Sequence, residues 1–340
     1  MPEQAPIRVA VIGCGLVAQR SHLPAYVSAP EAELEAVVSG RRETAETVAA
    51  QFGNPRVLDS WEAAIADPAV DAIDICTPNS LHAPIAIAAA RAGKHVIVEK
   101  PMATTIAEAD AMVAAARETG VTLMVAHNLR FVPIYQAVQK AMAQGTIGAP
   151  FSARGIFMHA GPDEFWGATS SWFWQEQEAG GGSLLDMGIH MIDLLRWIIG
   201  RPVLEVTSMT SRVSRPTFAD DNAMLVMRME GDVLASVQAS WSARPFPDRQ
   251  IAIHGELGHI AMGRSAEEPL VINLKDGAGS RKVIPEVLAA SPIGDPFAAF
   301  VRSIQGGVEP PVTGEDGRAS LAIALAAYES ARTGRVVQLD

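Results

Sequence analysis

The sequence predicts an α/β protein with an N-terminal doubly wound parallel sheet and a C-terminal α+β domain built on a large, mostly antiparallel open sheet. In the first third of the chain, short β-branched runs alternate with alanine-rich helical stretches, as in strands joined by crossover helices. From about Val203 to Leu274, strand-like runs follow one another with only turns between them, which is typical of an antiparallel sheet. We therefore predict one domain over residues 1–126 and a second over residues 127–340.

Buried strands and the helices between them make up the first predicted domain. The strands are expected at Arg8–Ile12, Glu35–Ser39, Ala72–Cys76, His95–Val98 and Thr122–Ala126, and the helices at Ala18–Ser28, Glu43–Phe52, Trp61–Ala66, Ala83–Ala92 and Ile106–Thr119. Asp59-Ser60 can cap the third of these helices, and Gly120 can end the last. The alternation predicts a sheet covered by helices on both faces.

A different pattern follows after His127. Helices are expected at Pro133–Ala143, Ser183–Ile199, Phe297–Ile304 and Gly317–Ala331, and strands at Phe151–Met158, Val203–Val213, Asn222–Met229, Val233–Trp241, Gln250–His254, His259–Met262 and Leu270–Leu274. A loop rich in aromatic residues spans Gly161–Gly182. Successive strands without helices between them predict the antiparallel sheet of the second domain.

Composition and charge exclude several classes of protein. The 340 residues suffice for two domains, and 49% hydrophobic against 19% charged residues excludes a disordered chain. The net charge of -11 disfavours nucleic acid and anionic membranes as partners. Apolar segments such as Ala83–Ala90 are too short to span a bilayer, and the first ten residues lack the pattern of an export signal. We expect a cytoplasmic protein that binds neither nucleic acid nor a membrane.

A glycine-rich turn, Gly13-Cys14-Gly15-Leu16-Val17-Ala18, joins the first strand to the first helix. Its glycines permit close backbone approach, and the start of the helix offers N–H groups and a positive dipole end to a pyrophosphate. Because a strand precedes the turn and a helix follows it, we favour dinucleotide binding over a merely structural turn. The predicted contacts are Gly13, Gly15, Leu16, Val17 and Ala18.

The end of the second strand distinguishes NADP(H) from NAD(H). A carboxylate there would bind the ribose hydroxyls of NAD and repel a 2′-phosphate. Glu33 and Glu35 have the expected spacing but precede the apolar run, and so lie at the wrong end of the strand. The other end carries Ser39-Gly40-Arg41-Arg42, whose guanidinium groups suit a phosphate. We predict NADP(H), with NAD(H) as the less favoured cofactor; two solvated arginines on an acidic surface are the alternative reading.

Two further strands end at the same carboxyl edge, where open α/β sheets bind ligands. One ends in Thr77-Pro78-Asn79-Ser80-Leu81-His82, which makes Thr77, Pro78, Asn79 and His82 candidate cofactor contacts. The next ends in Glu99-Lys100-Pro101. A protonated Lys100 can hold the oxygen of a reacting alcohol or carbonyl and stabilise negative charge as it develops. An ion pair of Lys100 with Glu99 is the alternative.

The second domain supplies a candidate acid–base pair. On a helix, Asp186 and His190 lie four residues apart on one face, and Asp193 follows on that face. An imidazole with an ordinary pKa of about 6.5 suits proton transfer near neutrality. The alternatives are a half-buried structural histidine and a metal site. A third strong nitrogen or sulfur ligand is missing nearby, so we predict no bound metal.

Five aromatic rings lie in the loop before this helix, at Phe165-Trp166 and Trp172-Phe173-Trp174. Aromatic faces stack on the C–H surface of a sugar ring, and His159 and Gln175 could bind its hydroxyls. The alternative is that the same rings pack the loop onto the sheet.

Taken together, these motifs resemble the Gfo/Idh/MocA family, the glucose–fructose oxidoreductase and inositol dehydrogenase relatives. The matching segments cover nearly the whole chain in order: Gly13–Ala18, Thr77–His82, Glu99–Pro101, Asn128–Phe131, Gly180–Asp193 and Tyr328–Gly334. The resemblance implies a Rossmann domain and a second domain whose open sheet mediates a homodimer or homotetramer. It also implies hydride transfer between a nicotinamide and a hydroxyl-bearing carbon of a sugar, cyclitol or related polyol.

When the family's site residues are matched to this sequence by position, the resemblance implies that Lys100 binds the reacting oxygen, that His190 is the general acid/base and that Asp186 assists it. Candidate cofactor contacts then include Glu99, Lys100 and Asn128, and candidate substrate contacts are Lys100, Arg130, His159, Trp172, Trp174, Asp186 and His190. Gln175 departs from the family, in which many relatives carry a charged residue. The alternatives are a non-catalytic dinucleotide- or sugar-sensing protein on the same scaffold and a nicotinamide-assisted glycoside hydrolase.

Overall fold

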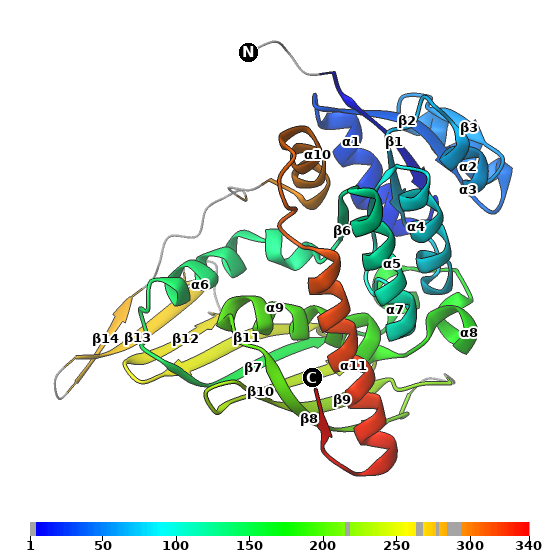
Figure 1. Cartoon of the computed structure of the whole chain (residues 1–340). Coiled ribbons are helices and arrows are strands. Elements are labelled where there is room, and N and C mark those ends of the chain that lie inside the picture. Colours follow the sequence, from blue (N-terminus) through cyan, green and yellow to red (C-terminus); the bar gives the residue numbers. More distant parts are fainter. Residues whose placement is uncertain are drawn as a thin grey trace. The chain divides into compact units, whose positions relative to one another are not determined.

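The computed structural model describes residues 5–214, 218–262, 268–276, 279–283, 291 and 294–339 (Figure 1). The chain forms two compact units. The first comprises Met1–His127, Gln177–Ala179 and Ile293–Arg318, and the second comprises Asn128–Glu176, Gly180–Pro292 and Ala319–Asp340. Within the described ranges, no helix is both long and apolar enough to cross a membrane.

The first unit contains a wholly parallel six-stranded sheet, which confirms the predicted doubly wound fold. Its strands are β1 (Ile7–Ile12), β2 (Ala32–Val38), β3 (Arg56–Leu58), β4 (Ala72–Ile75), β5 (His95–Val98) and β6 (Leu123–Val125). Their spatial order is β3-β2-β1-β4-β5-β6, so the direction of winding reverses between β1 and β4. Ligands of open α/β sheets bind outside the carboxyl ends of the strands at such a switch point.

Helices of this unit begin and end where the local sequence favours it. They are η1 (Ala18–His22), α1 (Leu23–Ser28), α2 (Arg42–Gln51), α3 (Trp61–Ala66), η2 (Asn79–Leu81), α4 (His82–Arg91), α5 (Ile106–Thr119) and α10 (Pro296–Gly306). The Ser60 hydroxyl caps α3, and Thr105 and Glu108 form a reciprocal capping box on α5. Gly120 ends α5 with a φ of 72°, a conformation that glycine adopts without strain.

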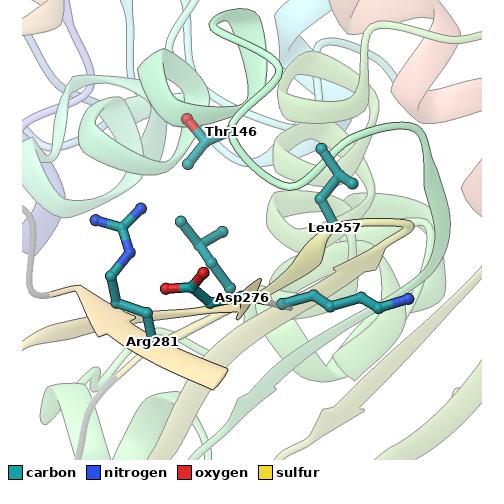
Figure 2. Close-up of a pocket in the computed structure, with 6 residues that line it drawn as sticks. Thr146, Leu257, Asp276 and Arg281 are labelled. Carbon is teal, nitrogen blue, oxygen red and sulfur yellow. The ribbon is translucent and has the colours of Figure 1, made fainter. Parts of the chain in front are cut away.

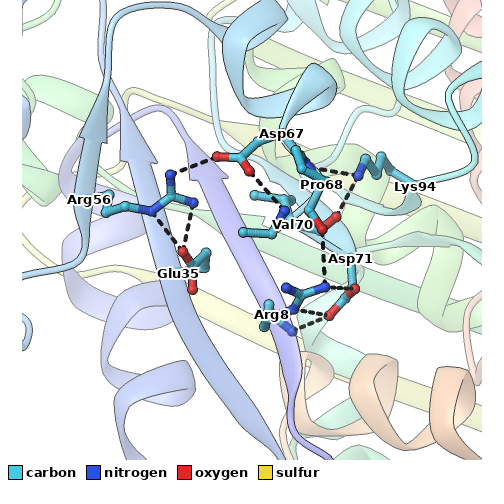
Figure 3. A network of polar contacts seen from close by, with 9 residues as sticks. Arg8, Glu35, Arg56, Asp67, Pro68, Val70, Asp71 and Lys94 are labelled. Carbon is cyan, nitrogen blue, oxygen red and sulfur yellow. Dashed lines mark hydrogen bonds and ion pairs between the residues drawn. The ribbon is translucent and has the colours of Figure 1, made fainter.

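Ion pairs tie together the amino-terminal side of the same sheet (Figure 3). Arg8 on β1 pairs with Asp71 at 2.7 Å. Arg56 on β3 pairs with Glu35 at 2.6 Å and with Asp67 at 2.7 Å. Glu35 is thus engaged away from the carboxyl ends of the strands, as its place before the apolar run predicts.

The second unit contains a nine-stranded sheet in the order β14-β13-β12-β11-β7-β10-β9-β8-β15. Its strands are β7 (Pro150–Met158), β8 (Val203–Ser211), β9 (Asn222–Met229), β10 (Val233–Ser240), β11 (Asp248–Gly255), β12 (Gly258–Met262), β13 (Leu270–Asp276), β14 (Gly279–Val283) and β15 (Val337–Gln338). Among the strands in the described ranges, β7 and β10 alone pair in parallel, which confirms the mostly antiparallel sheet.

Helices cover one face of this large sheet (Figure 1). The helical elements of this unit are η3 (Asn128–Phe131), α6 (Pro133–Ala143), α7 (Pro162–Trp166), η4 (Trp172–Trp174), η5 (Leu184–Gly188), α9 (Ile189–Ile199) and most of α11 (Gly314–Thr333), whereas all but the first residue of α8 (Glu176–Ala179) belongs to the first unit. A side chain on Gly155 of β7 would approach Met191 of α9 to 3.0 Å, so glycine lets this helix pack closely. On the other face, Met209, Met224 and Val226 are 82%, 60% and 44% exposed.

Candidate functional site

The GxGxxA turn lies at the carboxyl end of β1, beside the switch point. Gly13 has a φ of 106°, and a Cβ there would lie 2.2 Å from the carbonyl oxygen of Cys76, so only glycine fits. A Cβ on Gly15, in contrast, would meet no atom within 4 Å. The turn leads directly into a helix whose second part, η1, is π-helical. Open space beside the backbone and a helix N-terminus together suit a pyrophosphate.

The end of β4 adds a second feature that fits a ligand. The Thr77 hydroxyl oxygen is buried and has no hydrogen-bond partner among the residues that the structure describes. Buried hydroxyls are normally satisfied, so an incoming ligand group is a natural partner for this one. Nearby, the Asn79 amide donates to the Ala179 carbonyl at 2.8 Å. The open turn and the Thr77 hydroxyl therefore fit a bound dinucleotide.

His82 connects the ends of β4 and β5. Its Nε2 lies 3.0 Å from the Thr77 carbonyl oxygen and its Nδ1 lies 2.8 Å from the Pro101 carbonyl oxygen. Burial lowers the pKa of His82, so the ring is neutral at pH 7 and donates to one of the two carbonyls.

The residues that follow β2 are at the surface. Arg42 pairs with Glu46 at 2.8 Å and also contacts Asp59. Arg41 is exposed, and no described side chain forms an ion pair with it. A Cβ on Gly40 would meet no atom within 4 Å. This end of the strand therefore offers one exposed guanidinium group and one paired group.

Lys100 follows β5 and is half-buried. Its backbone N–H donates to Oε2 of Glu99 at 3.1 Å. The other carboxylate oxygen of Glu99 lies 3.1 Å from Nε2 of His22, whose Nδ1 lies 2.9 Å from both carboxylate oxygens of Asp74. The sequence pattern predicted Glu99 and Lys100 as site residues. It did not predict the contact of His22 with Glu99 or the contact of Asp74 with His22.

In the second unit, Asp186 and His190 lie on consecutive helical elements. Asp186 belongs to the π-helical η5, and His190 lies in the first turn of α9. The indole N–H of Trp241 donates to the Asp186 carboxylate at 3.0 Å. His190 is buried, and its ring centroid lies 5.7 Å from that of Phe157. The indole fixes the orientation of the carboxylate, while an aromatic ring borders the imidazole.

Two predicted substrate contacts are deeply buried. Arg130 forms a bidentate ion pair with Asp193, with N–O distances of 2.8 and 2.6 Å. His159 lies between the Met187 sulfur, 3.1 Å from Nε2, and the Gly161 N–H, which donates to Nδ1 at 2.9 Å. The Arg130 pair joins η3 to α9. Roles of Arg130 and His159 toward a substrate stay predictions.

The aromatic loop reaches Asp186 through ring contacts. Trp172 and Phe173 stack with centroids 3.8 Å apart. Trp174 packs edge-on against Trp241 at 5.6 Å, and Trp241 is the residue that holds Asp186. Both Trp172 and Trp174 are half-buried, whereas Asn128 on η3 is exposed.

Asp220 fixes the start of η5, and nothing in the local sequence predicts it. Its Oδ2 accepts from the Ser183 hydroxyl at 2.6 Å and from the Leu184 N–H at 2.8 Å, while Oδ1 accepts from the Tyr328 hydroxyl at 2.6 Å. Tyr328 in turn accepts from the Gly182 N–H at 2.9 Å. Burial raises the pKa of Asp220 against the opposing effect of these bonds.

A hollow of about 270 Å³ lies elsewhere in the second unit, near β13 and β14 (Figure 2). It is lined by Thr146, Leu257, Leu274, Lys275, Asp276 and Arg281. None of the candidate site residues borders it.

Comparisons with known proteins cover both units. Residues 7–127 match a family model described as the oxidoreductase family with an NAD-binding Rossmann fold, and residues 135–261 match the GFO/IDH/MocA C-terminal domain. The chain is 32% identical to a 1,5-anhydro-D-fructose reductase of Ensifer adhaerens over 98% of each chain. It is 34% identical to a D-apiose dehydrogenase of Paraburkholderia graminis, over 97% of this chain and 89% of that protein.

Solved structures show the same fold. A levoglucosan dehydrogenase in complex with NADH and levoglucosan matches with a TM-score of 0.84 at 28% identity, over 98% of this chain and 99% of that one.

Proposed function

Since the chain belongs to the GFO/IDH/MocA family of NAD-binding oxidoreductases, we propose that it transfers a hydride between NADP(H) and a hydroxyl- or carbonyl-bearing carbon of a sugar, cyclitol or related polyol. One observation carries the proposal: the open turn at Gly15, the Thr77 hydroxyl, which has no partner among the described residues, and Lys100 follow three neighbouring strands, β1, β4 and β5. Relatives named for anhydrofructose, apiose and levoglucosan support a polyhydroxylated substrate.

In this proposal, each reactive side chain has one task. A bound nicotinamide dinucleotide supplies or accepts the hydride. The Lys100 ammonium donates a hydrogen bond to the reacting oxygen and stabilises the negative charge that develops there. His190 takes up or returns the hydroxyl proton. Asp186, oriented by Trp241, assists His190 or holds a neighbouring hydroxyl.

Substitution of Lys100 tests this assignment. We expect Lys100→Met to lower kcat at least about 100-fold, because one charge-stabilising donor is lost, while the dissociation constant of NADP stays within about threefold. Initial rates of NADP and NAD reduction over a panel of sugars and cyclitols give kcat, and fluorescence titration gives the affinity. Lys140→Met, on the exposed side of α6, is the control.

Full activity of Lys100→Met would remove the lysine from the mechanism. Release of free sugar from a glycoside without net reduction of the cofactor would favour the hydrolase alternative.

The preference for NADP(H) rests on Arg41, the exposed guanidinium after β2. A guanidinium–phosphate contact contributes about 1.5–3 kcal/mol, so Arg41→Ala should weaken NADP binding about 10- to 100-fold and leave NAD binding within about threefold. Titration of both cofactors against both proteins measures this. Equal losses for NADP and NAD, or no loss, would contradict a 2′-phosphate contact. NADH in the levoglucosan dehydrogenase structure makes NAD(H) the alternative.

We also propose a homo-oligomer through the face of the large sheet that helices leave open. Met209 on β8 lies directly opposite Met224 on β9, and Val226 is two residues further along β9. All three are exposed. Contiguous exposed apolar side chains of this kind mark association surfaces.

A further inference from the structure

His22 lies in the interior of the first unit between two carboxylates. Its ring is fully buried, as is the side chain of Asp74, and the Glu99 side chain is only 14% exposed. Phe297 of α10 covers the ring, with centroids 4.2 Å apart. The side chain therefore bridges β4 and the end of β5 in a place that water does not reach.

Both ring nitrogens of His22 face carboxylate oxygens, at 2.9 Å from Asp74 and 3.1 Å from Glu99. A neutral imidazole has only one N–H, so its lone pair would point at one of the carboxylates. The doubly protonated ring donates to both. The two cations, His22 and Lys100, then balance the two anions, Asp74 and Glu99. Such pairing offsets the free energy that removing the charges from water costs.

Glu99 connects this pair to the lysine. One carboxylate oxygen of Glu99 binds His22 and the other accepts the backbone N–H of Lys100 at 3.1 Å. Beyond the lysine, His82 contacts the Pro101 carbonyl at 2.8 Å. The turn that carries Lys100 is thus held on both sides by buried histidines, His22 acting through Glu99.

We propose that His22 is a positioning residue for Lys100: through Glu99 it fixes the turn that presents the ammonium group to the substrate. The inference rests on the function proposed for Lys100. His22 closes η1, the segment that begins at Ala18 of the dinucleotide turn. One short helical segment therefore sets both the turn that faces the pyrophosphate and the lysine that faces the reacting oxygen.

A double-mutant cycle tests whether His22 acts through Glu99. His22→Gln keeps N–H donors but loses the charge and the second contact, and Glu99→Gln loses the carboxylate. We expect each to lower kcat about 10- to 100-fold. The double variant should be no more than about threefold worse than the poorer single variant, because both substitutions break one contact. Effects that multiply would overturn the proposal.

His95→Gln is the matched control, since His95 lies at the other end of β5 and its Nδ1 accepts only from the Thr122 N–H among the contacts described. Its kcat should stay within about threefold of wild type. A loss as large as that of His22→Gln would show that replacing any histidine of this strand region disturbs turnover, and would overturn a specific role for His22.

Chemical labelling provides a readout that needs no substrate. In the full-length protein, an amine-reactive reagent followed by mass spectrometry gives the labelling rate of Lys100 relative to Lys94, which its own bonds to the Asp67 and Val70 carbonyls hold in place. We expect this ratio to rise at least about threefold in His22→Gln and in Glu99→Gln, because the released turn exposes the lysine, and to stay unchanged in His95→Gln. An unchanged or lower ratio in the first two overturns the proposal.

The two proposals fail differently. If wild type reduces neither cofactor with any sugar or polyol but the labelling ratio responds, the proposed function fails and the positioning role stands. If His22→Gln does not fold, Glu99→Gln, which keeps the buried ring, carries the labelling test.

Discussion

Two buried histidines of the first unit have pKa shifts in opposite directions because their acceptors differ. His82 faces two backbone carbonyls, which carry only partial charges, and burial lowers its pKa. His22 faces two carboxylates. Burial is the largest single effect and opposes the charged form of His22, but the charge of Asp74, the hydrogen bond to Asp74 and the neighbouring Cys76 together outweigh it and raise the pKa of His22 well above its ordinary value. At neutral pH, one ring is an imidazolium and the other is not.

The raised pKa of His22 makes the stability of the protein depend on pH above neutrality. The stabilisation is complete below the ordinary value of about 6.5, where the unfolded chain is also protonated, and is lost as the pH rises toward the folded value. Within that window the free energy of unfolding should fall by about 1.4 kcal/mol per pH unit from this group. Urea unfolding at a series of pH values above 6.5 measures the slope.

Histidine NMR separates this group from the others. The His22 signal, identified by its loss in His22→Gln, should remain that of an imidazolium well above pH 6.5, and the His82 signal should titrate below it. The groups around His22 are Asp74 on β4, Cys76 after β4, and Glu99 with Lys100 after β5. Tyr26 on α1 faces Asp74 as well, with Asp295 before α10 on its other side. A His22 midpoint at or below 6.5 would contradict the imidazolium.

At the residue scale, the sequence was informative where a residue acts on its neighbours in the chain. Gly13 and the Ser60 cap follow from local rules of backbone geometry and capping, and both are found as predicted. Asp74 and Asp220 could not be predicted, because their partners are distant: His22 lies 52 residues from Asp74, and Tyr328 lies 108 residues from Asp220. No periodic pattern marks such pairs.

Both segments that carry the predicted chemistry contain a π-helical turn, η1 after the dinucleotide turn and η5 before His190. The sequence predicted plain helices at Ala18–Ser28 and Ser183–Ile199. The predicted positions of both helices are right. The π-helical turn could not be predicted from the pattern of apolar residues, because a helix with one extra residue in a turn still buries the same types of side chain. Such turns are rare and occur often at functional sites.

The contacts of Tyr328 allow a test of how η5 is held. Tyr328→Phe removes the hydroxyl that donates to Asp220 and accepts from Gly182, leaving two buried groups without it. We expect a loss of about 1–3 kcal/mol in the free energy of unfolding, seen as a lower thermal midpoint, and a lower kcat because Asp186 follows within the same segment.

Tyr135→Phe is the matched control. The Tyr135 hydroxyl is buried in the same unit and has no hydrogen-bond partner in the part of the chain that the structure describes. Its removal should be neutral or slightly stabilising. Equal losses in the two variants would show that the Tyr328 contacts do not matter.

At the scale of the whole molecule, the fold class was predictable from the order of the elements. Strands and helices alternate in one half of the chain and do not in the other, and this order holds even where the exact bounds of an element are wrong. The three-residue β3 escaped prediction, since its half-exposed residues form no apolar run. So did the membership of Ile293–Arg318 in the first unit, because helical periodicity does not reveal which sheet a helix covers.

The exposed face of the large sheet predicts self-association. Met209→Glu with Met224→Glu places two like charges opposite each other on neighbouring strands. Light scattering after size exclusion should show wild type as an oligomer and the double variant as a monomer with an unchanged circular dichroism spectrum, because charge is costly to bury at an interface. Val308→Glu, exposed on the first unit, is the control. A monomeric wild type, or an oligomeric double variant, would contradict this surface.

The return of the chain to its first unit after residue 293 limits how the gene can be divided. A fragment that stops at His127 would encode all six parallel strands yet lack α10. Phe297 would then no longer shield the His22 imidazolium, and solvent would enter between Asp74 and Glu99. Any minimal nucleotide-binding protein made from this chain must therefore splice the late helix back onto the early sheet.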